Sequence, residues 1–325
     1  MFSTLNTYGR PEHEVGLFAK VACVLYHSIR KVQEISDEHA PEPVIYRDPY
    51  VKIPPQPITL VCISDTLGRQ LPSLPKGDIL LHAGNISAYG TFEEVQKQLD
   101  WIEQQPHEHK VVIAGSRDLI LDEIFSGQNK DDLNWGNIRH VNGYETSIDL
   151  LERGRKICIY GASHTPRSDD PEKQQNRAFQ YGNDPNQMED VFWYNYICAD
   201  TDVVLVHGPP KTHVDGGGKG CERLLAELRR VKPKAVVCGH VHEGRGEETL
   251  RWDGPQNWFE GIALGELNPW LCAVKMLWFL LVLVVKLLLG MEPKRDTRKT
   301  TRIVNASIAC GRRNVEKRDA IVVVI

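Results

Sequence analysis

A series of residues in this sequence has types and positions that suit metal or phosphate chemistry. They stand where short apolar runs end, and they are Asp65, Asn85, Ser116, Arg117, His207, His240 and His242. Carboxylate and imidazole groups suit manganese, iron or zinc, and an arginine fork suits phosphate. Two such cations would polarise a phosphoryl oxygen and bridge a hydroxide nucleophile. Any one residue alone is more often a cap or a surface group, so only the series as a whole indicates a site.

The runs before these residues are rich in β-branched residues and predict strands buried on both faces. Helical segments alternate with them. Thr91 and Glu94 form a capping box before one helix, and Cys221 begins another. This alternation predicts an α/β fold with functional side chains just past the carboxyl ends of the strands. The runs span residues 58–64, 78–82, 110–114, 156–160, 202–206 and 235–238.

The order of these motifs resembles the calcineurin-like metallophosphoesterase family, from about residue 58 to 246 and again over 301–325. The usual series is Asp-x-His, Gly-Asp, Gly-Asn-His-Asp/Glu, His and Gly-His-x-His. The small eukaryotic metallophosphoesterase-domain branch is the most similar, because this chain contains Ser-Asp-Thr, His-Ala-Gly, His-Gly-Pro-Pro and Gly-His-Val-His-Glu-Gly. The resemblance implies a four-layer α/β sandwich, in which two mixed β-sheets are flanked by helices.

The same resemblance implies metal ligands at Asp65, Asn85, His207, His240 and His242, but several family ligands are replaced. Leu67 stands where a histidine is expected, and Asn85 stands where an aspartate bridges two cations. Ser116 replaces an asparagine, and Arg117 replaces the histidine that assists the leaving group. Losing a carboxylate weakens the attraction that holds two dications together. We therefore expect one divalent ion (Mn, Fe or Zn) rather than two, or none.

Arg117 adds a fixed positive charge near the expected phosphate. We predict it as a catalytic and substrate-binding residue, with Asn85 beside it on the substrate. A salt bridge from Arg117 to Asp118 or to another nearby acid is an equally weighted alternative.

Two functions follow, and the sequence does not separate them. The first is a metal-dependent phosphoester or phosphodiester hydrolase, impaired or working with a single metal on a small phosphoester. The alternative is an inactive pseudoenzyme that binds a phosphate-bearing ligand or a protein partner. Lost ligands favour the pseudoenzyme, and the four retained ligands favour the enzyme.

The bulk composition narrows the partners and the compartment. A net charge of −4 over 325 residues leaves no basic field, so no nucleic-acid partner is expected. The eight cysteines are scattered without CxxC spacing and predict free thiols in a reducing compartment. No secretory signal pattern begins the chain, which favours a cytoplasmic location. The glycine run 216–220 is a weak phosphate-loop candidate, because Cys221 stands where Ser or Thr is needed.

We expect two parts in the chain. Residues 1–57 would form an amphipathic helix over about 14–35 and a proline-rich linker. Residues 58–325 would form the phosphoesterase-like domain, with an apolar helical insertion at about 268–292. If 301–325 completes the same sheet as 58–64, a single membrane span by the insertion is excluded. Its segment 270–289, with Lys275 and Lys286 on one face, then predicts membrane-surface contact, with core or oligomer packing as the alternative.

Overall fold

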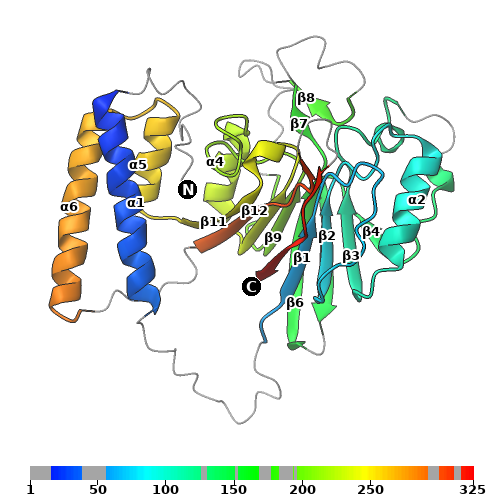
Figure 1. Ribbon diagram of the computed structural model, residues 1–325, viewed down its shortest axis with the longest axis horizontal. Coiled ribbons are helices and arrows are strands. Elements are labelled where there is room, and N and C mark those ends of the chain that lie inside the picture. The colour runs from blue at the N-terminus through cyan, green and yellow to red at the C-terminus, as the bar shows by residue number, and fades with distance from the viewer. Residues whose placement is uncertain are drawn as a thin grey trace. The chain divides into compact units, whose positions relative to one another are not determined.

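The structure, a computed structural model, describes residues 16–38, 56–125, 130–150, 153–167, 177–182, 193, 196–291, 300–310 and 316–325. Two compact units are present (Figure 1). The helical unit contains helix α1 and residues Leu250–Thr300, and the α/β unit contains Ile53–Thr249 and Thr301–Ile325. The predicted linker over 41–57 lies outside the described residues except for its last two.

The first sheet of the α/β unit has five strands in the order β15-β1-β2-β3-β4. Strands β1 to β4 run parallel, and β15 pairs antiparallel with β1. Parallel order brings the carboxyl ends of β1, β2 and β3 to one edge of the sheet. The strands span Ile321–Val324, Thr59–Ile63, Ile79–Ala83, His109–Ile113 and Ile138–His140 in that order.

The second sheet has six strands in the order β11-β12-β10-β9-β6-β5. Strands β12, β10, β9 and β6 run parallel, and β5 pairs antiparallel with β6. The strands span Gly246–Arg251, Thr300–Asn305, Ala235–Cys238, Val203–Val206, Arg155–Ala162 and Tyr144–Leu150. Two short pairs add β7 (Thr165–Pro166) with β8 (Gln180–Tyr181), and β13 (Ala309–Cys310) with β14 (Glu316–Lys317).

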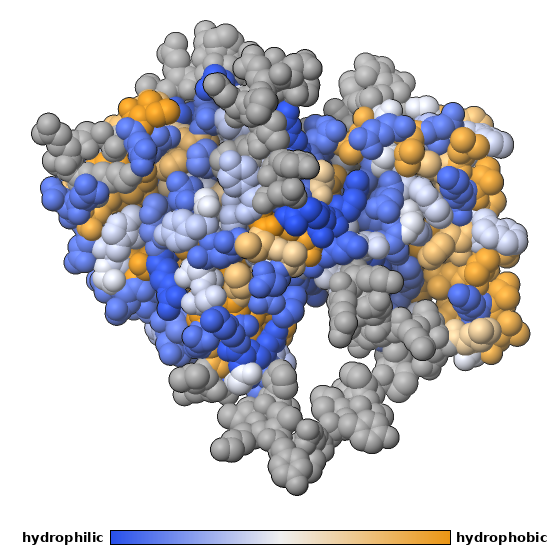
Figure 2. Space-filling model, turned by 180° about the vertical axis from the view of Figure 1, so that it is seen from behind, coloured by the Kyte–Doolittle hydropathy of each residue, from blue (hydrophilic) through white to orange (hydrophobic). Residues whose placement is uncertain are grey.

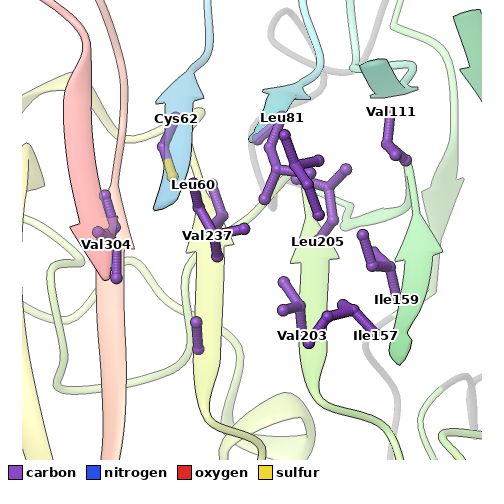
Figure 3. Close-up of a cluster of buried hydrophobic side chains, with 14 of the residues drawn as sticks. Leu60, Cys62, Leu81, Val111, Ile157, Ile159, Val203, Leu205, Val237 and Val304 are labelled. Carbon is purple, nitrogen blue, oxygen red and sulfur yellow. The ribbon is translucent and has the colours of Figure 1, made fainter. Parts of the chain in front are cut away.

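The two sheets face each other across an apolar core. Leu60 and Leu81 from the first sheet point toward Val203, Leu205 and Val237 from the second (Figure 3). All five side chains are fully buried. This is why the predicted strand runs are continuously apolar: each strand is covered on both faces.

Helices cover the outer faces of the sheets. Helix α2 (Phe92–Glu103) follows β2 and packs Val95 and Leu99 against Val61 and Leu80. Helix α4 (Glu222–Val231) connects the parallel neighbours β9 and β10 and buries its apolar face. The predicted four-layer sandwich of two mixed sheets flanked by helices is confirmed. In the described part of the chain, short 3-10 helices lie in loops at Leu119–Leu121, Lys130–Asp132 and His242–Gly244.

The helical unit is built from α1 (Leu17–Glu38), α5 (Gly254–Ala263) and α6 (Pro269–Leu288). Helix α1 is the helix predicted over 14–35, and α6 is the predicted apolar insertion. Tyr26 of α1 stacks on Phe259 of α5 with ring centroids 4.3 Å apart, and Met276 of α6 is buried in the same core. Arg30 of α1 forms an ion pair with Asp253, the residue that caps α5, at 2.8 Å.

Candidate functional site

The predicted site residues lie on loops that follow five strands of the α/β unit. Asp65 follows β1, Asn85 follows β2 and Arg117 follows β3, whereas His207 and His240 follow β9 and β10 of the second sheet. The two sheets meet at this edge, since the N–H of His240 donates to Asp65 Oδ2 over 2.8 Å and His207 Nδ1 lies 2.7 Å from the carbonyl oxygen of Ala83.

The backbone of the site is held in the left-handed region. The φ angles are 55° at Asp65, 51° at Leu67, 54° at Asn85 and 65° at His240. A left-handed conformation costs a non-glycine residue roughly 1–2 kcal/mol, so the surrounding fold must enforce it. Backbone hydrogen bonds do so, because Asp65 N–H donates to Gly84 O at 2.9 Å and Leu67 N–H donates to Asn85 O at 3.0 Å.

The Asp65 carboxylate is fully buried and surrounded by donors. Its Oδ2 accepts from Ser64 Oγ, Ser307 Oγ and His240 N–H, each at 2.8 Å. Its Oδ1 accepts from Asn85 Nδ2 at 2.8 Å and lies 3.4 Å from His242 Nε2. Burial alone would raise the pKa of Asp65, but His242, His207 and the donated N–H of His240 together bring that pKa well below its ordinary value. Asp65 is therefore an ionised carboxylate that protein donors already satisfy.

Asn85 occupies the expected bridging position, and both its polar atoms are used by the protein. Its Nδ2 donates to Asp65, while its Oδ1 accepts the backbone N–H of Arg117 at 2.8 Å. An aspartate here would offer two negative oxygens to a cation. The amide instead places N–H groups where the neighbouring carboxylate needs donors, so Asn85 links the loops after β1 and β3.

His207 and His240 form the other half of the site. Their rings lie edge to face with centroids 4.9 Å apart. Nδ1 of His207 donates to Ala83 O, and among the described residues its buried Nε2 has no hydrogen-bond partner. Desolvation, reinforced by His207 and Arg177, lowers the pKa of His240 to about 3. His240 is therefore a neutral imidazole near pH 7.

Arg177 lies close to His240, and Arg117 lies close to Arg177. The side chain of Arg117 is exposed, and its Nη1 reaches the carbonyl oxygen of Ala88 at 3.4 Å. Arg177 is half-buried, and burial together with the charge of Arg117 lowers the pKa of its guanidinium. Within the described ranges neither arginine has a carboxylate partner. Two like charges close to each other without acids to neutralise them indicate a place for an anion.

Arg177 was not predicted from the sequence. No family motif surrounds it in the sequence. Its position is fixed by the next residue, because Ala178 N–H donates to the carbonyl oxygen of Ser116 at 2.9 Å. This long-range contact holds Arg177 near the predicted site.

Asp118 is not the partner of Arg117, so the alternative of a salt bridge between them is wrong. The buried Asp118 carboxylate accepts from Gly115 N–H and Ser87 N–H at 2.8 Å, and from Ser87 Oγ at 2.6 Å. It ties the loop after β2 to the loop after β3. The Arg117 side chain is thereby left available for a ligand.

The glycine run 216–220 is organised around a carboxylate of the protein. Asp215 accepts from the N–H groups of Gly217, Gly218 and Gly220 at 3.0–3.2 Å. It also accepts from Thr212 N–H at 2.9 Å. These donors are the ones that a phosphate loop would offer to its ligand, so the structure argues against a phosphate loop here.

The side chains at the site do not fit the dinuclear metal centre that the resemblance implies. Among the described residues no cluster of three or more His, Cys, Asp or Glu side chains is arranged to hold a metal ion. Asp65 is satisfied by protein donors, and Asn85 directs N–H groups rather than an oxygen toward it. The structure brings Asp65, Asn85, His207, His240 and His242 together, while their role as metal ligands stays a prediction.

Comparisons with known proteins agree with the motifs. A family model described as calcineurin-like phosphoesterase matches residues 35–244. Probable rhamnogalacturonate lyase C of Emericella nidulans is 35% identical over 272 residues, which cover 82% of this chain and 24% of that protein. Metallophosphoesterase domain-containing protein 1 of Homo sapiens is 33% identical over 217 residues, or 59% of this chain and 63% of that protein.

A third relative is matched over more of its own length. UPF0046 protein K07C11.7 of Caenorhabditis elegans is 31% identical over 240 residues, which cover 68% of this chain and 76% of that protein. The chain thus spans about a quarter of the first relative and under two thirds of the second. The matches confirm the predicted resemblance to the small eukaryotic metallophosphoesterase branch.

Proposed function

This chain belongs to the calcineurin-like phosphoesterase family, and we propose that it is a pseudoenzyme that binds a phosphate-bearing ligand. One observation carries the proposal: both oxygens of the Asp65 carboxylate accept hydrogen bonds from the protein. In the family this carboxylate faces a cation. A charge that is already satisfied gains little from a metal, because binding the metal would require several of those hydrogen bonds to be broken.

The ligand class follows from the two arginines. Arg177 lies close enough to His240 to lower its pKa, and Arg117 lies close to Arg177, so the two arginines supply positive charge at this edge of the site. A guanidinium offers paired N–H donors that match phosphate oxygens. His207 Nε2 and the neutral His240 lie behind them, and Asn85 positions the backbone of Arg117. A small phosphoester suits this arrangement, because its anionic oxygens would neutralise the repulsion between the arginines.

Calorimetric titration with inorganic phosphate and with p-nitrophenyl phosphate, in the presence of EDTA, tests the proposal. We expect binding without metal. Arg117→Ala and Arg177→Ala should each weaken binding by at least about tenfold, since hydrogen bonds to charged groups are worth about 1.5–3 kcal/mol. The matched control is Arg302→Ala. This arginine of β12 forms an ion pair with Glu247 of β11, and its removal should leave binding unchanged. Absence of binding, or equal losses for all three variants, would remove the proposal.

A single-metal hydrolase is the second candidate, and one observation favours it. The unpartnered Nε2 of His207 lies beside His240, and imidazole nitrogens suit Zn, Mn or Fe. Elemental analysis, together with hydrolysis of bis-p-nitrophenyl phosphate in added Mn²⁺, separates the two candidates. The pseudoenzyme predicts no bound metal and no turnover. Turnover that His240→Ala abolishes would establish the hydrolase instead.

A further inference from the structure

Helix α6 exposes a large apolar surface. Helix α6 is long and apolar enough to cross a membrane, and it is the only such helix among the described residues. Just 22% of the residues in its most apolar 18-residue stretch are buried. Figure 2 shows hydrophobic side chains gathered over the helical unit. Isolated exposed apolar residues are normal, but a continuous patch of this kind marks an interaction surface.

The exposed positions cover more than one side of α6. At about 100° per residue they span roughly 200° of the helix circumference, and the narrower remaining sector packs on α1 and α5. The buried sector contains Cys272, Ala273, Met276 and Leu283. The centre of the exposed sector is entirely apolar, with the side chain of Trp278 67% exposed. The exposed apolar residues are Trp270, Leu271, Val274, Leu277, Trp278, Leu281, Val282, Val284, Val285, Leu288 and Leu289.

The charges on this surface have one sign. Lys275 and Lys286 are exposed, and they project about 20° apart around the helix, at one edge of the apolar sector. Lys275 also lies 6.0 Å from the ring of Trp258 on α5. Over residues 269–291 the sequence contains no Asp or Glu. An apolar centre with lysines along one flank is the pattern of a helix lying in a membrane interface.

Helix α1 also exposes apolar side chains and a lysine. It packs beside α6, and its N-terminal half exposes Leu17, Phe18, Val21 and Val24. Its one charged residue over 17–28 is Lys20, which is also exposed. The two helices thus present apolar and cationic groups without an acidic one in these segments.

The chain path excludes a single crossing of the bilayer. Strand β11 precedes α5 and α6, and β12 follows them, yet these strands are hydrogen-bonded neighbours in one sheet. A crossing by α6 alone would put β11 and β12 on opposite sides of the membrane. The ten residues of α5 cover about 15 Å, half of the hydrocarbon thickness, so α5 cannot make the return crossing.

We propose that the exposed face of α6, together with the N-terminal half of α1, docks in the plane of an anionic lipid surface. Trp270 and Trp278 suit the headgroup boundary, and Lys20, Lys275 and Lys286 face anionic headgroups. A second copy of the chain is disfavoured, because it would bring lysines against lysines with no carboxylate between them. The lipid surface supplies both the apolar volume and the opposite charge.

Flotation of the full chain with vesicles tests the proposal. We expect binding to phosphatidylserine–phosphatidylcholine vesicles, weaker binding to phosphatidylcholine alone, and release as salt rises. The double variant Trp278→Glu with Leu281→Glu should reduce binding by at least about tenfold. Its control, Ile124→Glu, also replaces an exposed apolar side chain by glutamate, at a position that is 86% exposed in the α/β unit, and should bind as before.

Substitution of the lysines keeps the test independent of folding. Lys275→Ala and Lys286→Ala should each weaken binding to the anionic vesicles about fivefold, with little effect on neutral ones. Lys97→Ala on α2 is the matched control. The proposal fails if the folded protein floats with neither kind of vesicle, or if the Trp278→Glu, Leu281→Glu variant floats equally well. A lipid-free dimer that this variant converts to monomer, with no vesicle binding, would assign the surface to a second copy instead.

Discussion

The two halves of the site, around Asp65 and around His207, differ in how the protein satisfies their polar atoms. Asp65 accepts hydrogen bonds from Ser64, Asn85, His240 and Ser307. His207 keeps a buried Nε2 that has no partner among the described residues. Around Asp65 two family ligands, at positions 67 and 85, are replaced, and the carboxylate is held by protein donors. Around His207 the imidazoles remain, and no described group donates to or accepts from the buried Nε2.

The largest expected effect is on stability at Asp65. Asp65→Ala leaves several buried donors without an acceptor and should lower the free energy of unfolding by about 3–5 kcal/mol. His207→Gln loses the hydrogen bond to Ala83 and the edge-to-face contact with His240, and should cost about 1–2 kcal/mol. Urea denaturation measures both, with Glu266→Ala at an exposed site as the neutral control. Equal losses at Asp65 and His207 would contradict the difference between the halves.

Restoring family ligands in each half separately sharpens the comparison. Leu67→His with Asn85→Asp should raise Mn²⁺ affinity on the order of a hundredfold, because it adds an imidazole and puts a second carboxylate beside Asp65 that a cation must neutralise. Ser116→Asn with Arg117→His, in the half that kept its imidazoles, should gain less. Calorimetric titration with Mn²⁺ measures the affinity of both double variants. If neither pair binds more Mn²⁺ than the parent chain, the assignment of these positions to the family's ligands is wrong.

Acid titration probes His82, which lies behind the Asp65 half. His82 is fully buried, with Nε2 3.0 Å from Thr66 Oγ1, and burial lowers its pKa to about 3. The unfolded chain takes up this proton near pH 6.5 and the folded chain does not, so stability falls as pH drops from about 6.5 toward 3. At about pH 5 the loss is about 2 kcal/mol.

The His82→Gln variant should lack that part of the acid-dependent loss. The measurement is the slope of unfolding free energy against pH, so a constant cost of the substitution cancels. Identical slopes for the parent and His82→Gln would place the acid sensitivity elsewhere, for example at His240.

The smallest effect is expected at Leu67. Leucine is held there at φ 51° and is half-buried. Asparagine tolerates this conformation better, so Leu67→Asn should raise stability by about 1 kcal/mol, whereas the β-branched Leu67→Ile should lower it. Thermal unfolding separates the two variants. If Leu67→Ile raised the unfolding temperature instead, the backbone conformation at position 67 would not be what limits stability there.

Much of the site was predictable because its signals are local. Each strand run ends in small or polar residues, and parallel strands bring such ends together, so Asp65, Asn85 and Arg117 could be placed at one edge. The capping box was only half right. Thr91 Oγ1 accepts from Glu94 N–H at 3.3 Å, but the Glu94 carboxylate accepts from Tyr89 N–H rather than reaching the cap. A neighbouring turn offered Glu94 a closer donor, which no local pattern reveals.

By itself the sequence determined the order of strands and helices, the family motifs with their missing ligands, and the apolar character of α6, because residue type and spacing fix these locally. Only the tertiary structure decided that Asp65 is satisfied by Ser307, 242 residues away, and that Arg177 stands beside the imidazoles. It also decided which sector of α6 is covered by α1 and α5. Hydrogen-bond saturation and exposure depend on which distant groups come within a few ångströms, and the chain specifies that only through the packing of the whole fold.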